Sequence, residues 1–317
     1  MSNKILLLGA AGQIGTELTT FLIEKYGYAN VIASDIKPEL PQSNALYEQV
    51  DATDYNAIES CVIKYNVDTI YLMAAMLSAT GEKAPAKAWH LNMTSLMHVL
   101  NLAKEGLVKK VFWPSSIAVF GETTPKHNVS QSTITEPSTV YGISKLAGER
   151  WCEYYKEKYN VDVRSLRYPG IISWKAQPGG GTTDYAVEIF HEAVKNRSYN
   201  CFLRADSELP MMYMDDAIAA TVQLMEADKE ELVSHISYNI AATSFTPEIL
   251  AKYIKKILPD FSIEYNPDFR QKIADSWPSS IDDSAARADW NWSPKYNLEE
   301  ITREMISKLE DRYAINS

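Results

Sequence analysis

Short apolar runs alternate with amphipathic stretches along the first half of the chain. The run Ile5–Leu8 is too short and too continuously apolar for an amphipathic helix, and it is typical of a strand covered on both faces of a parallel sheet. After it, apolar residues recur at helical spacing from Gln13 until Tyr26-Gly27-Tyr28 ends the helix. Because this alternation repeats, the pattern predicts an α/β fold built on a parallel sheet.

The same reasoning places the remaining elements. Further strands are expected at 30–35, 45–50, 67–75, 108–116, 161–168 and 238–240. Further helices are expected at 55–65, 89–100, 140–159, 185–194, 246–257 and 298–309, and one more begins at Met214 with Asp215 as its cap. The segments expected to be loops or turns are 76–82, 121–137, 169–172 and 173–184.

Composition narrows the class of partner. The 317 residues include 31 basic and 41 acidic ones, and the net charge of −10 disfavours binding to nucleic acid or to anionic membranes. No run reaches the roughly 18 apolar residues of a membrane span. Cys61, Cys152 and Cys201 are too scattered for a disulfide framework, and the histidines lack metal-ligand spacing. We expect a cytoplasmic protein without a metal, acting on a small molecule.

Three glycines separate the first strand from the first helix. Gly9, Gly12 and Gly15 form a Gly-x-x-Gly-x-x-Gly pattern at a junction where the backbone turns sharply. A pyrophosphate can approach such a turn closely, and the free N–H groups of the helix N-terminus stabilise its charge. The alternative is a tight turn without a ligand.

Asp35 makes the dinucleotide interpretation much stronger. It closes the second strand 20 residues after Gly15, where a carboxylate accepts hydrogen bonds from adenosine ribose hydroxyls. A carboxylate repels a 2′-phosphate, and Ile36-Lys37 supplies no arginine, so the predicted cofactor is NAD. A helix cap or loop carboxylate is the alternative for Asp35, and Asp51 after the third strand is a candidate for the adenine amino group.

Small and polar residues follow the fourth strand and occur again in the next helix. The small residues that end Leu72-Met73-Ala74-Ala75 allow a flat cofactor to pass close to the backbone. The hydroxyls of segment 76–82 are either substrate ligands or part of a polar surface loop, with nothing in the residues to decide. Asn92 lies on the inward stripe formed by Trp89, Met93 and Leu96, where it serves packing or a proton path, and packing is the simpler reading.

Tyr141 and Lys145 share one face of the helix at 140–159. A phenol is a poor base at its ordinary pKa of about 10, but a neighbouring ammonium and an oxidised nicotinamide both favour the phenolate. Lowering the pKa of Tyr141 by about 2–3 units makes it a competent base near neutral pH. Tyr-x-x-x-Lys also occurs in ordinary helices, but here a serine, Ser116, lies 25 residues upstream at the same sheet edge.

The second half of the chain carries candidates for the substrate. Three glycines lead into Thr182-Thr183-Asp184 and the helix at 185–194, so this segment is either a mobile surface loop or a capped helix N-terminus able to hold a small carboxylate. Trp277, beside a proline, is a candidate roof for the pocket. Trp290 and Trp292 are expected to be packing residues.

Together, the glycine pattern, Asp35, Asn92, Ser115-Ser116 and Tyr141-x-x-x-Lys145 resemble the extended short-chain dehydrogenases/reductases, which include the UDP-galactose epimerases. The resemblance covers essentially the whole chain and implies a doubly wound, Rossmann-type parallel sheet with a smaller C-terminal substrate-binding domain. It implies Ser116 as the catalytic hydroxyl, with Ser115 as the neighbouring alternative, and Asn92 as ordering the lysine and its water. The expected NAD-binding domain is 1–172 plus about 212–242, and the expected substrate domain is about 173–211 plus 243–317.

Four segments, 77–82, 167–170, 179–185 and 275–278, closely resemble the short-chain type of L-threonine dehydrogenase. This resemblance implies a homodimer in which NAD⁺ accepts a hydride from C3 of L-threonine, giving 2-amino-3-oxobutyrate without a metal. The implied catalytic residues are Ser116, Tyr141 and Lys145. The implied substrate contacts are Ser78, Thr80, Ser116, Tyr141, Gly180, Thr182 and Trp277. The predicted NAD contacts are Gly9, Gly12, Gln13, Ile14, Gly15, Asp35, Ile36, Asp51, Ala52, Leu72, Ala74, Ala75, Asn92, Ser115, Tyr141, Lys145, Tyr168 and Ile171.

Two other functions fit the same fold. A nucleotide-sugar epimerase or dehydratase uses the same serine, tyrosine and lysine, but it needs basic residues for a diphosphate, for which the second half offers scattered Arg270, Lys272 and Arg287. A non-catalytic NAD-sensing regulator has no need of an ionised phenol, so an intact Ser116, Tyr141 and Lys145 argue against it.

Overall fold

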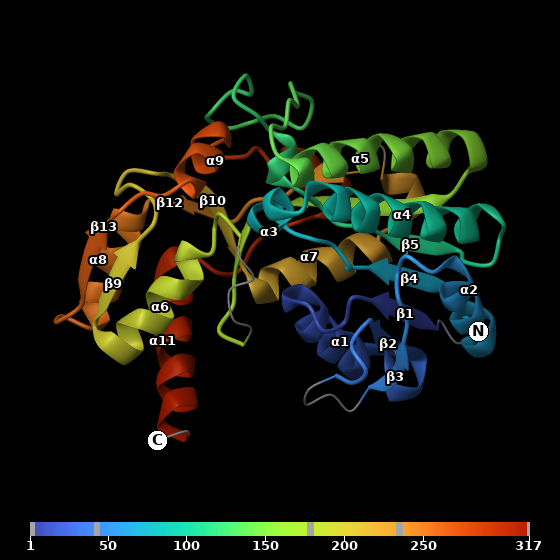
Figure 1. The fold of residues 1–317 in the computed structure, drawn as a ribbon, viewed down its shortest axis with the longest axis horizontal. Coiled ribbons are helices and arrows are strands. Elements are labelled where there is room, and N and C mark those ends of the chain that lie inside the picture. Colours follow the sequence, from blue (N-terminus) through green and yellow to red (C-terminus); the bar gives the residue numbers. More distant parts are fainter. Residues whose placement is uncertain (1–3, 41–44, 176–180, 233–236, 316–317) are drawn as a thin grey trace.

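A twisted parallel sheet forms the larger part of the molecule (Figure 1). The computed structural model describes residues 4–40, 45–175, 181–232 and 237–315. The strand order is that of a Rossmann fold, and each recorded pairing within this sheet is parallel. In spatial order the strands are β11 (Ser237–Asn239), β7 (Asp162–Tyr168), β5 (Lys110–Phe112), β4 (Thr69–Leu72), β1 (Ile5–Leu8), β2 (Val31–Asp35) and β3 (Leu46–Gln49), with β6 (Ser115–Ser116) beside β7.

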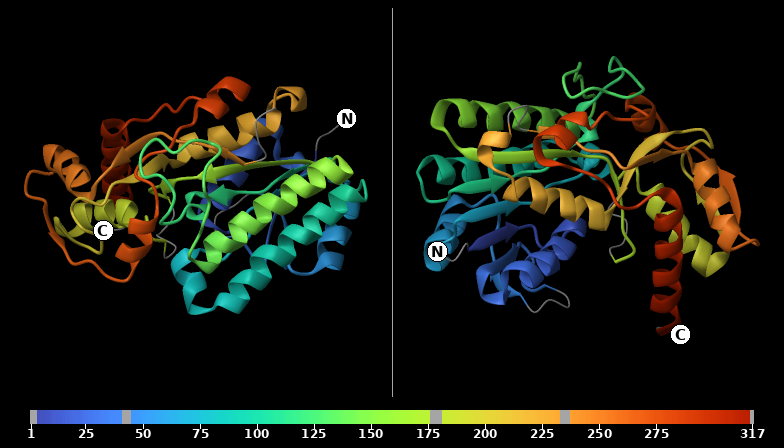
Figure 2. Two further views of the ribbon diagram at one scale, coloured as in Figure 1. Left: turned by 90° about the horizontal axis from the view of Figure 1, so that it is seen from above. Right: turned by 180° about the vertical axis from the view of Figure 1, so that it is seen from behind.

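Helices cover both faces of this sheet (Figures 1 and 2). On one face lie α1 (Gln13–Tyr26) and α7 (Met214–Glu226). On the other lie α2 (Tyr55–Tyr65), α4 (Pro85–Lys104) and α5 (Val140–Tyr159). Successive strand residues therefore enter different cores, as when Leu7 packs toward α1 and Leu6 toward α2 and α4. Burial on both faces explains the continuous apolar runs in the sequence.

The second lobe has two small sheets and its own helices. In one sheet β10 (Leu209–Tyr213) pairs with β8 (Gly170–Ile172) and β12 (Thr243–Phe245), and in the other β9 (Ser198–Cys201) pairs with β13 (Ser262–Tyr265). The remaining helices of the fold are α3 (Ser78–Lys83), α6 (Tyr185–Asn196), α8 (Pro247–Ile257), α9 (Arg270–Ser276), α10 (Ser284–Trp290) and α11 (Leu298–Ile315). Short 3₁₀ turns are at Tyr28–Asn30, Ile117–Val119 and Lys229–Glu231.

The core of this lobe is built mainly from α6, α8, α11 and the small sheets. Ile117–Val119 and Phe120, which precede α5, pack into the same core. The two regions therefore share packing at the point where the chain leaves the carboxyl end of β6. The predicted domain boundaries stay a prediction. The two regions are least distinct where they share this core.

Several predicted elements are confirmed and others need correction. Helix α2 has the predicted bounds, and the Thr246 side chain caps α8 by accepting from the Ile249 N–H. The tryptophans at 290 and 292 are buried in the core, as expected. The three cysteines are buried and free.

The expected loop at 76–82 instead contains α3, and the expected turn at 169–172 is mostly strand β8. Both elements are very short, and they are stabilised by packing and by pairing with β10 rather than by their own sequence pattern. The strand predicted at 108–116 is interrupted at Pro114, which has no N–H to donate.

Some side chains also differ from expectation. Trp89, predicted on an inward stripe, is exposed near the start of α4. Asp215 is not the cap of α7, whose N-cap is Tyr213; Asp215 instead accepts from the Tyr296 hydroxyl. Among the described residues, no helix is both long and apolar enough to cross a membrane, and no group of potential ligands is placed to hold a metal.

Candidate active site

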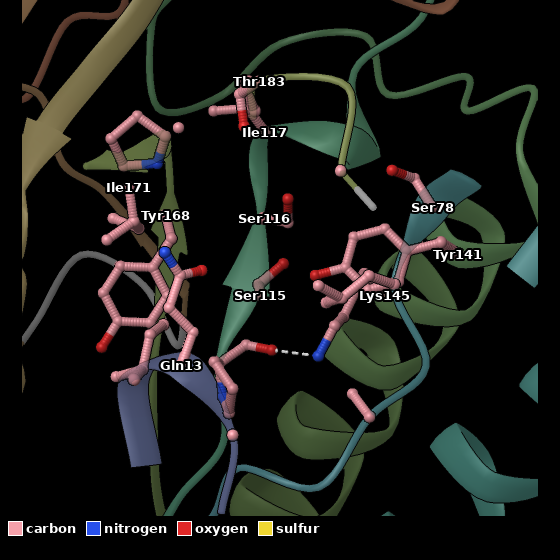
Figure 3. Close-up of a pocket in the computed structure, with 18 of the residues that line it drawn as sticks. Gln13, Ser78, Ser115, Ser116, Ile117, Tyr141, Lys145, Tyr168, Ile171 and Thr183 are labelled. Atoms are coloured by element: carbon pink, nitrogen blue, oxygen red, sulfur yellow. Dashed lines mark hydrogen bonds between the residues drawn. The ribbon is translucent and has the colours of Figure 1, made fainter. Parts of the chain in front are cut away.

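A cavity lies at the carboxyl ends of β1, β4, β6 and β7, where open α/β sheets bind their ligands. Its walls come from the glycine turn, from Ser115 and Ser116 on β6, from α5 and from the second lobe. In Figure 3 the Tyr141 hydroxyl points from α5 toward the strand that carries the two serines, with Tyr168 and Ile171 on the opposite wall. The cavity therefore brings together residues from both halves of the chain.

The glycine turn is shaped by close backbone contacts. Gly9 has a φ of +91°, and a Cβ there would lie 2.5 Å from the Ala74 nitrogen. A Cβ on Gly15 would lie 2.2 Å from the Gly9 oxygen. Helix α1 begins directly after this turn with Gly12 as N-cap, which offers no side chain to its first N–H groups. These groups are available to an anionic ligand such as a diphosphate.

Asp35 lies at the end of β2 beside this turn. Its Oδ2 accepts from the Ala11 N–H at 3.0 Å and its Oδ1 from the Lys37 N–H at 3.2 Å. A carboxylate retains further acceptor positions after two such bonds, so Asp35 can still accept from ribose hydroxyls. Asp51 is more locally engaged, because its Oδ1 accepts from both the N–H and the hydroxyl of Thr53.

Lys145 is buried, and backbone and aromatic groups hold its ammonium. Its Nζ donates to the Pro114 carbonyl at 2.6 Å, the contact drawn in Figure 3. The same atom lies 4.5 Å from the Trp113 ring centre and 5.5 Å from the Tyr141 ring centre. Burial lowers the pKa of Lys145 to about 7, although the nearby charges of Cys152 and Glu149 oppose that shift.

Burial also acts on Tyr141, in the direction opposite to the one predicted. Burial raises the pKa of Tyr141 to about 12, and the Ser116 side chain only partly opposes this. The expected lowering by a neighbouring ammonium is therefore not produced by the protein groups alone. The reason is that desolvation disfavours a buried phenolate. The same burial lowers the pKa of Lys145, so a smaller fraction of its amine carries the positive charge that would stabilise the phenolate.

The two adjacent serines have different surroundings. Ser115 is fully buried, and its hydroxyl donates to Glu149 Oε1 at 2.6 Å, while Arg167 holds that carboxylate with two further bonds. Ser116 accepts a 3.2 Å bond from the Ala118 N–H, and its side chain also interacts with Tyr141 across the cavity. Of the two alternatives, Ser116 is the one placed to interact with a ligand.

Asn92 connects the loop after β4 to the start of α5. Its Oδ1 accepts from the Met76 N–H at 2.8 Å, and its Nδ2 donates to the Met76 carbonyl and to Ser144 Oγ. Ser144 in turn donates to the Tyr141 carbonyl at 2.7 Å. The amide is thus satisfied by groups that position the tyrosine, and this arrangement agrees with the packing interpretation.

Polar side chains at the other end of the cavity come from α3 and from the segment before α6. Ser78 and Thr182 are buried and line it, and Thr182 Oγ1 has no hydrogen-bond partner within the described parts of the chain. Trp277 closes this end. Thr80 is exposed, because residues two apart on a helix face different directions and Ser78 takes the inward one.

The NAD dependent epimerase/dehydratase family matches residues 5–241, which is most of the chain. The chain belongs to the NAD dependent epimerase/dehydratase family. An uncharacterized epimerase/dehydratase of Staphylococcus haemolyticus is 47% identical, and the match covers 98% of each chain. The GalE-like L-threonine dehydrogenase from Cupriavidus necator, in its holo form, is 55% identical with a TM-score of 0.95, covering 96% of this chain and 99% of that one. The L-threonine dehydrogenase from Phytophthora infestans is 46% identical with the same TM-score, covering 98% and 100%.

The cavity of this epimerase/dehydratase family member contains most of the residues predicted from the sequence. Those that line it are Gly9, Gly12, Gln13, Ile14, Gly15, Ala75, Ser78, Ser115, Ser116, Tyr141, Lys145, Tyr168, Ile171, Thr182 and Trp277. Those that do not line it are Asp35, Ile36, Asp51, Ala52, Leu72, Ala74, Thr80 and Asn92, and Gly180 lies outside the described residues. Leu72 is buried in the core, where it supports the sheet.

Other lining residues were not predicted. They are Met73, Leu77, Pro114, Ile117, Pro169, Gly170, Gly181, Thr183 and Asp184. Gly181, Thr183 and Asp184 belong to the Gly-Gly-Gly-Thr-Thr-Asp stretch that the sequence had indicated, so their neighbours carried a usable signal. The Pro114 carbonyl accepts a hydrogen bond from Lys145, and no sequence pattern predicts such a contact. An NAD molecule fits this donor set, because Gly12, the N-cap of α1, has no side chain to occupy the first N–H groups of the helix and leaves them open to a diphosphate.

Proposed function

We propose that this protein oxidises L-threonine at its C3 hydroxyl with NAD⁺, forming 2-amino-3-oxobutyrate in threonine catabolism. The observation that carries the proposal is the convergence of Ser116, Tyr141 and Lys145 with the glycine turn in one cavity. The substrate is inferred from the relatives, since L-threonine dehydrogenases from Cupriavidus necator and Phytophthora infestans match almost the whole chain.

In the proposed reaction the C3 hydroxyl loses its proton to Tyr141 while the C3–H bond breaks. When bound, NAD⁺ supplies the hydride acceptor and a positive charge near the phenol. Ser116 orients the substrate oxygen by donating a hydrogen bond to it. Lys145, held by the Pro114 carbonyl beneath the Tyr141 ring, supports the ionised phenol and contacts the nicotinamide ribose. The product is a β-keto acid that readily loses carbon dioxide.

The substrate end of the cavity suits a small carboxylate. The Thr182 hydroxyl is buried without a partner in the described residues. A hydrogen bond to a ligand oxygen would therefore offset the free-energy cost of burying it unpaired. Thr182 lies just before Asp184, the N-cap of α6, whose Oδ2 accepts from the Gly181 N–H. We assign Ser78, Thr182 and Trp277 to the substrate, and Thr80 is omitted because it is exposed.

NAD is the proposed cofactor, with the diphosphate at the glycine turn and the adenosine ribose at Asp35. The carboxylate beside the Ala11 N–H would repel the additional phosphate of NADP. Asp51 and Asn92 are assigned indirect roles, because their own hydrogen bonds go to neighbouring protein groups.

A nucleotide-sugar epimerase is the second candidate, and the basic residues argue against it. Arg270 pairs with Asp268 and lies over the Phe202 ring, and Arg287 pairs with Asp283. Neither lines the cavity in the described part of the chain, so neither is placed to hold a sugar diphosphate there.

We further propose a cytoplasmic homodimer. Free, buried cysteines suit a reducing compartment. Exposed aromatic and aliphatic side chains on α4 and α5 offer a surface for a second copy; they are Trp89, Ile143, Trp151 and Tyr154.

The test is the absorbance of NADH formed from NAD⁺ and L-threonine. UDP-sugars are incubated in parallel and their products are separated by chromatography, because epimerisation forms no net NADH. We expect turnover of threonine alone, and its absence under alkaline conditions would refute the proposal. Tyr141→Phe should reduce kcat by about a thousandfold or more and leave NAD⁺ affinity nearly unchanged, because only the base is lost. Tyr154→Phe, on the exposed face of the same helix, is the matched control.

A further inference from the structure

Glu17 is a buried carboxylate that the proposed chemistry does not use. It lies on α1 one turn after Gln13, which lines the cavity, and its side chain is only 4% exposed. Its Oε1 accepts from the Ser173 hydroxyl, and its Oε2 lies 3.1 Å from Lys175 Nζ. The cofactor helix is therefore joined directly to the segment that follows β8.

Ser173–Lys175 is also held from its other side. Arg312 on α11 donates to the carbonyls of Trp174 at 2.9 Å and Lys175 at 3.1 Å. Within the segment, the Lys175 N–H donates to Ser173 Oγ at 3.1 Å. In Figure 1 this part of the chain lies between α1 and α11. One short segment thus contacts a helix of each lobe.

The position of this segment matters because cavity residues lie before and after it in the chain. Gly170 and Ile171 on β8 line the cavity, and so do Gly181 and Thr182 further along. A buried carboxylate is costly unless its partners keep their geometry, so Glu17 constrains Ser173 and Lys175 strongly. If α1 moves as a rigid element, Ser173–Lys175 should move with it, and these residues precede the proposed substrate-binding residues in the chain.

We propose that Glu17 is a positioning residue that couples cofactor binding at the start of α1 to the placement of the substrate-binding residues after β8. The ligand identities rest on the proposed function. The coupling itself depends on the contacts of Glu17 with Ser173 and Lys175. Of the two, the Ser173 contact should matter more, because Ser173 is buried and Lys175 is about half exposed.

The first test needs no substrate. Amide hydrogen exchange at 173–175 is measured with and without NAD⁺ in the wild type, in Glu17→Gln, and in the control Glu24→Gln on the exposed face of α1. We expect NAD⁺ to slow exchange about tenfold in the wild type and the control, and to have no effect in Glu17→Gln. Equal protection in all three proteins would overturn the coupling.

The second test uses threonine turnover. Glu17→Gln should raise the KM for L-threonine about tenfold, with kcat and the Kd of NAD⁺ changed less than about threefold, whereas a general loss of structure would lower kcat and raise the Kd of NAD⁺ as well. Ser173→Ala, which leaves Glu17 paired with Lys175, should show the same split. A wild type that does not oxidise threonine refutes the proposed substrate but leaves the exchange result decisive for the coupling. Unchanged KM in both variants overturns the coupling.

Discussion

At the scale of single residues, the proposed role of Tyr141 as the base predicts how the rate depends on pH. Burial raises its pKa to about 12 in the protein itself, so the phenol keeps its proton at neutral pH and cannot accept another. Because the ionised fraction grows as pH rises, kcat for threonine should increase about tenfold per pH unit below the pKa of Tyr141 in the complex with NAD⁺ and threonine. A rate profile measured from neutral to alkaline pH checks this, and a flat profile would exclude Tyr141 as the base.

At the same scale, the role proposed for Asp35 is to favour NAD over NADP. Asp35→Asn keeps an acceptor for the Ala11 N–H but removes the charge that repels a 2′-phosphate. The ratio of kcat/KM for NADP⁺ to that for NAD⁺ should rise by about tenfold or more. Glu39→Gln, an exposed change in the following loop, should leave the ratio unaltered. An unchanged ratio in Asp35→Asn would contradict the assigned role.

At the scale of elements, a buried ion pair holds α5 against β7, and a hydrogen bond to the same carboxylate holds it against β6. Glu149 on α5 accepts two bonds from Arg167 on β7 and one from Ser115 on β6. Arg167 also donates to Asn239 Oδ1 on β11. The helix that carries Tyr141 and Lys145 is thereby fixed against the strand that carries Ser116.

Removing one member of the Glu149–Arg167 pair should lower the free energy of unfolding substantially. Arg167→Met leaves Glu149 buried without its main partner, and the free energy of unfolding should fall by about 3–5 kcal/mol in urea titrations. Glu299→Gln breaks the exposed Arg303 pair on α11 and should change stability little. A similar small loss in both variants would show that the buried pair is dispensable.

Elements with a strong local pattern were predictable, and those fixed by distant contacts were not. Helix α2 has eleven residues with regular apolar spacing and a capping Asp54, so its bounds follow from the sequence. Strand β8 has three residues and exists because it pairs with β10, some forty residues further along the chain. The Glu149–Arg167 pair likewise joins residues whose partnership no spacing rule predicts.

At the scale of the whole molecule, the outer surface of α4 and α5 is the feature that predicts assembly. Trp151 and Tyr154 are each 41% exposed, and their rings contact one another edge to face. We expect Trp151→Glu to convert a dimer into a monomer in light scattering, because it places a charge in an apolar contact. Ile249→Glu on α8, a comparably exposed position, is the control. A wild type that is monomeric would refute the dimer.

The candidate site could be predicted in outline because its chemistry lies in short motifs. The glycine turn, Asp35 and the tyrosine–lysine pair each carry a recognisable spacing, and the fold brings them to one sheet edge. What the sequence could not supply is the electrostatic state of Tyr141 and Lys145, which depends on burial by both lobes. The choice between Ser115 and Ser116 also required the buried Glu149.

The interruption at Pro114 has a consequence for how this site tolerates genetic change. The acceptor that holds Lys145 is a main-chain oxygen, so any amino acid at position 114 supplies it. A proline there leaves the strand without one N–H donor, and the register of pairing with β7 continues on both sides of it. A replacement at this position keeps the oxygen, but its side chain must also fit a buried place beside the cavity. The acceptor for Lys145 is therefore set by the course of the backbone and not by the identity of a side chain.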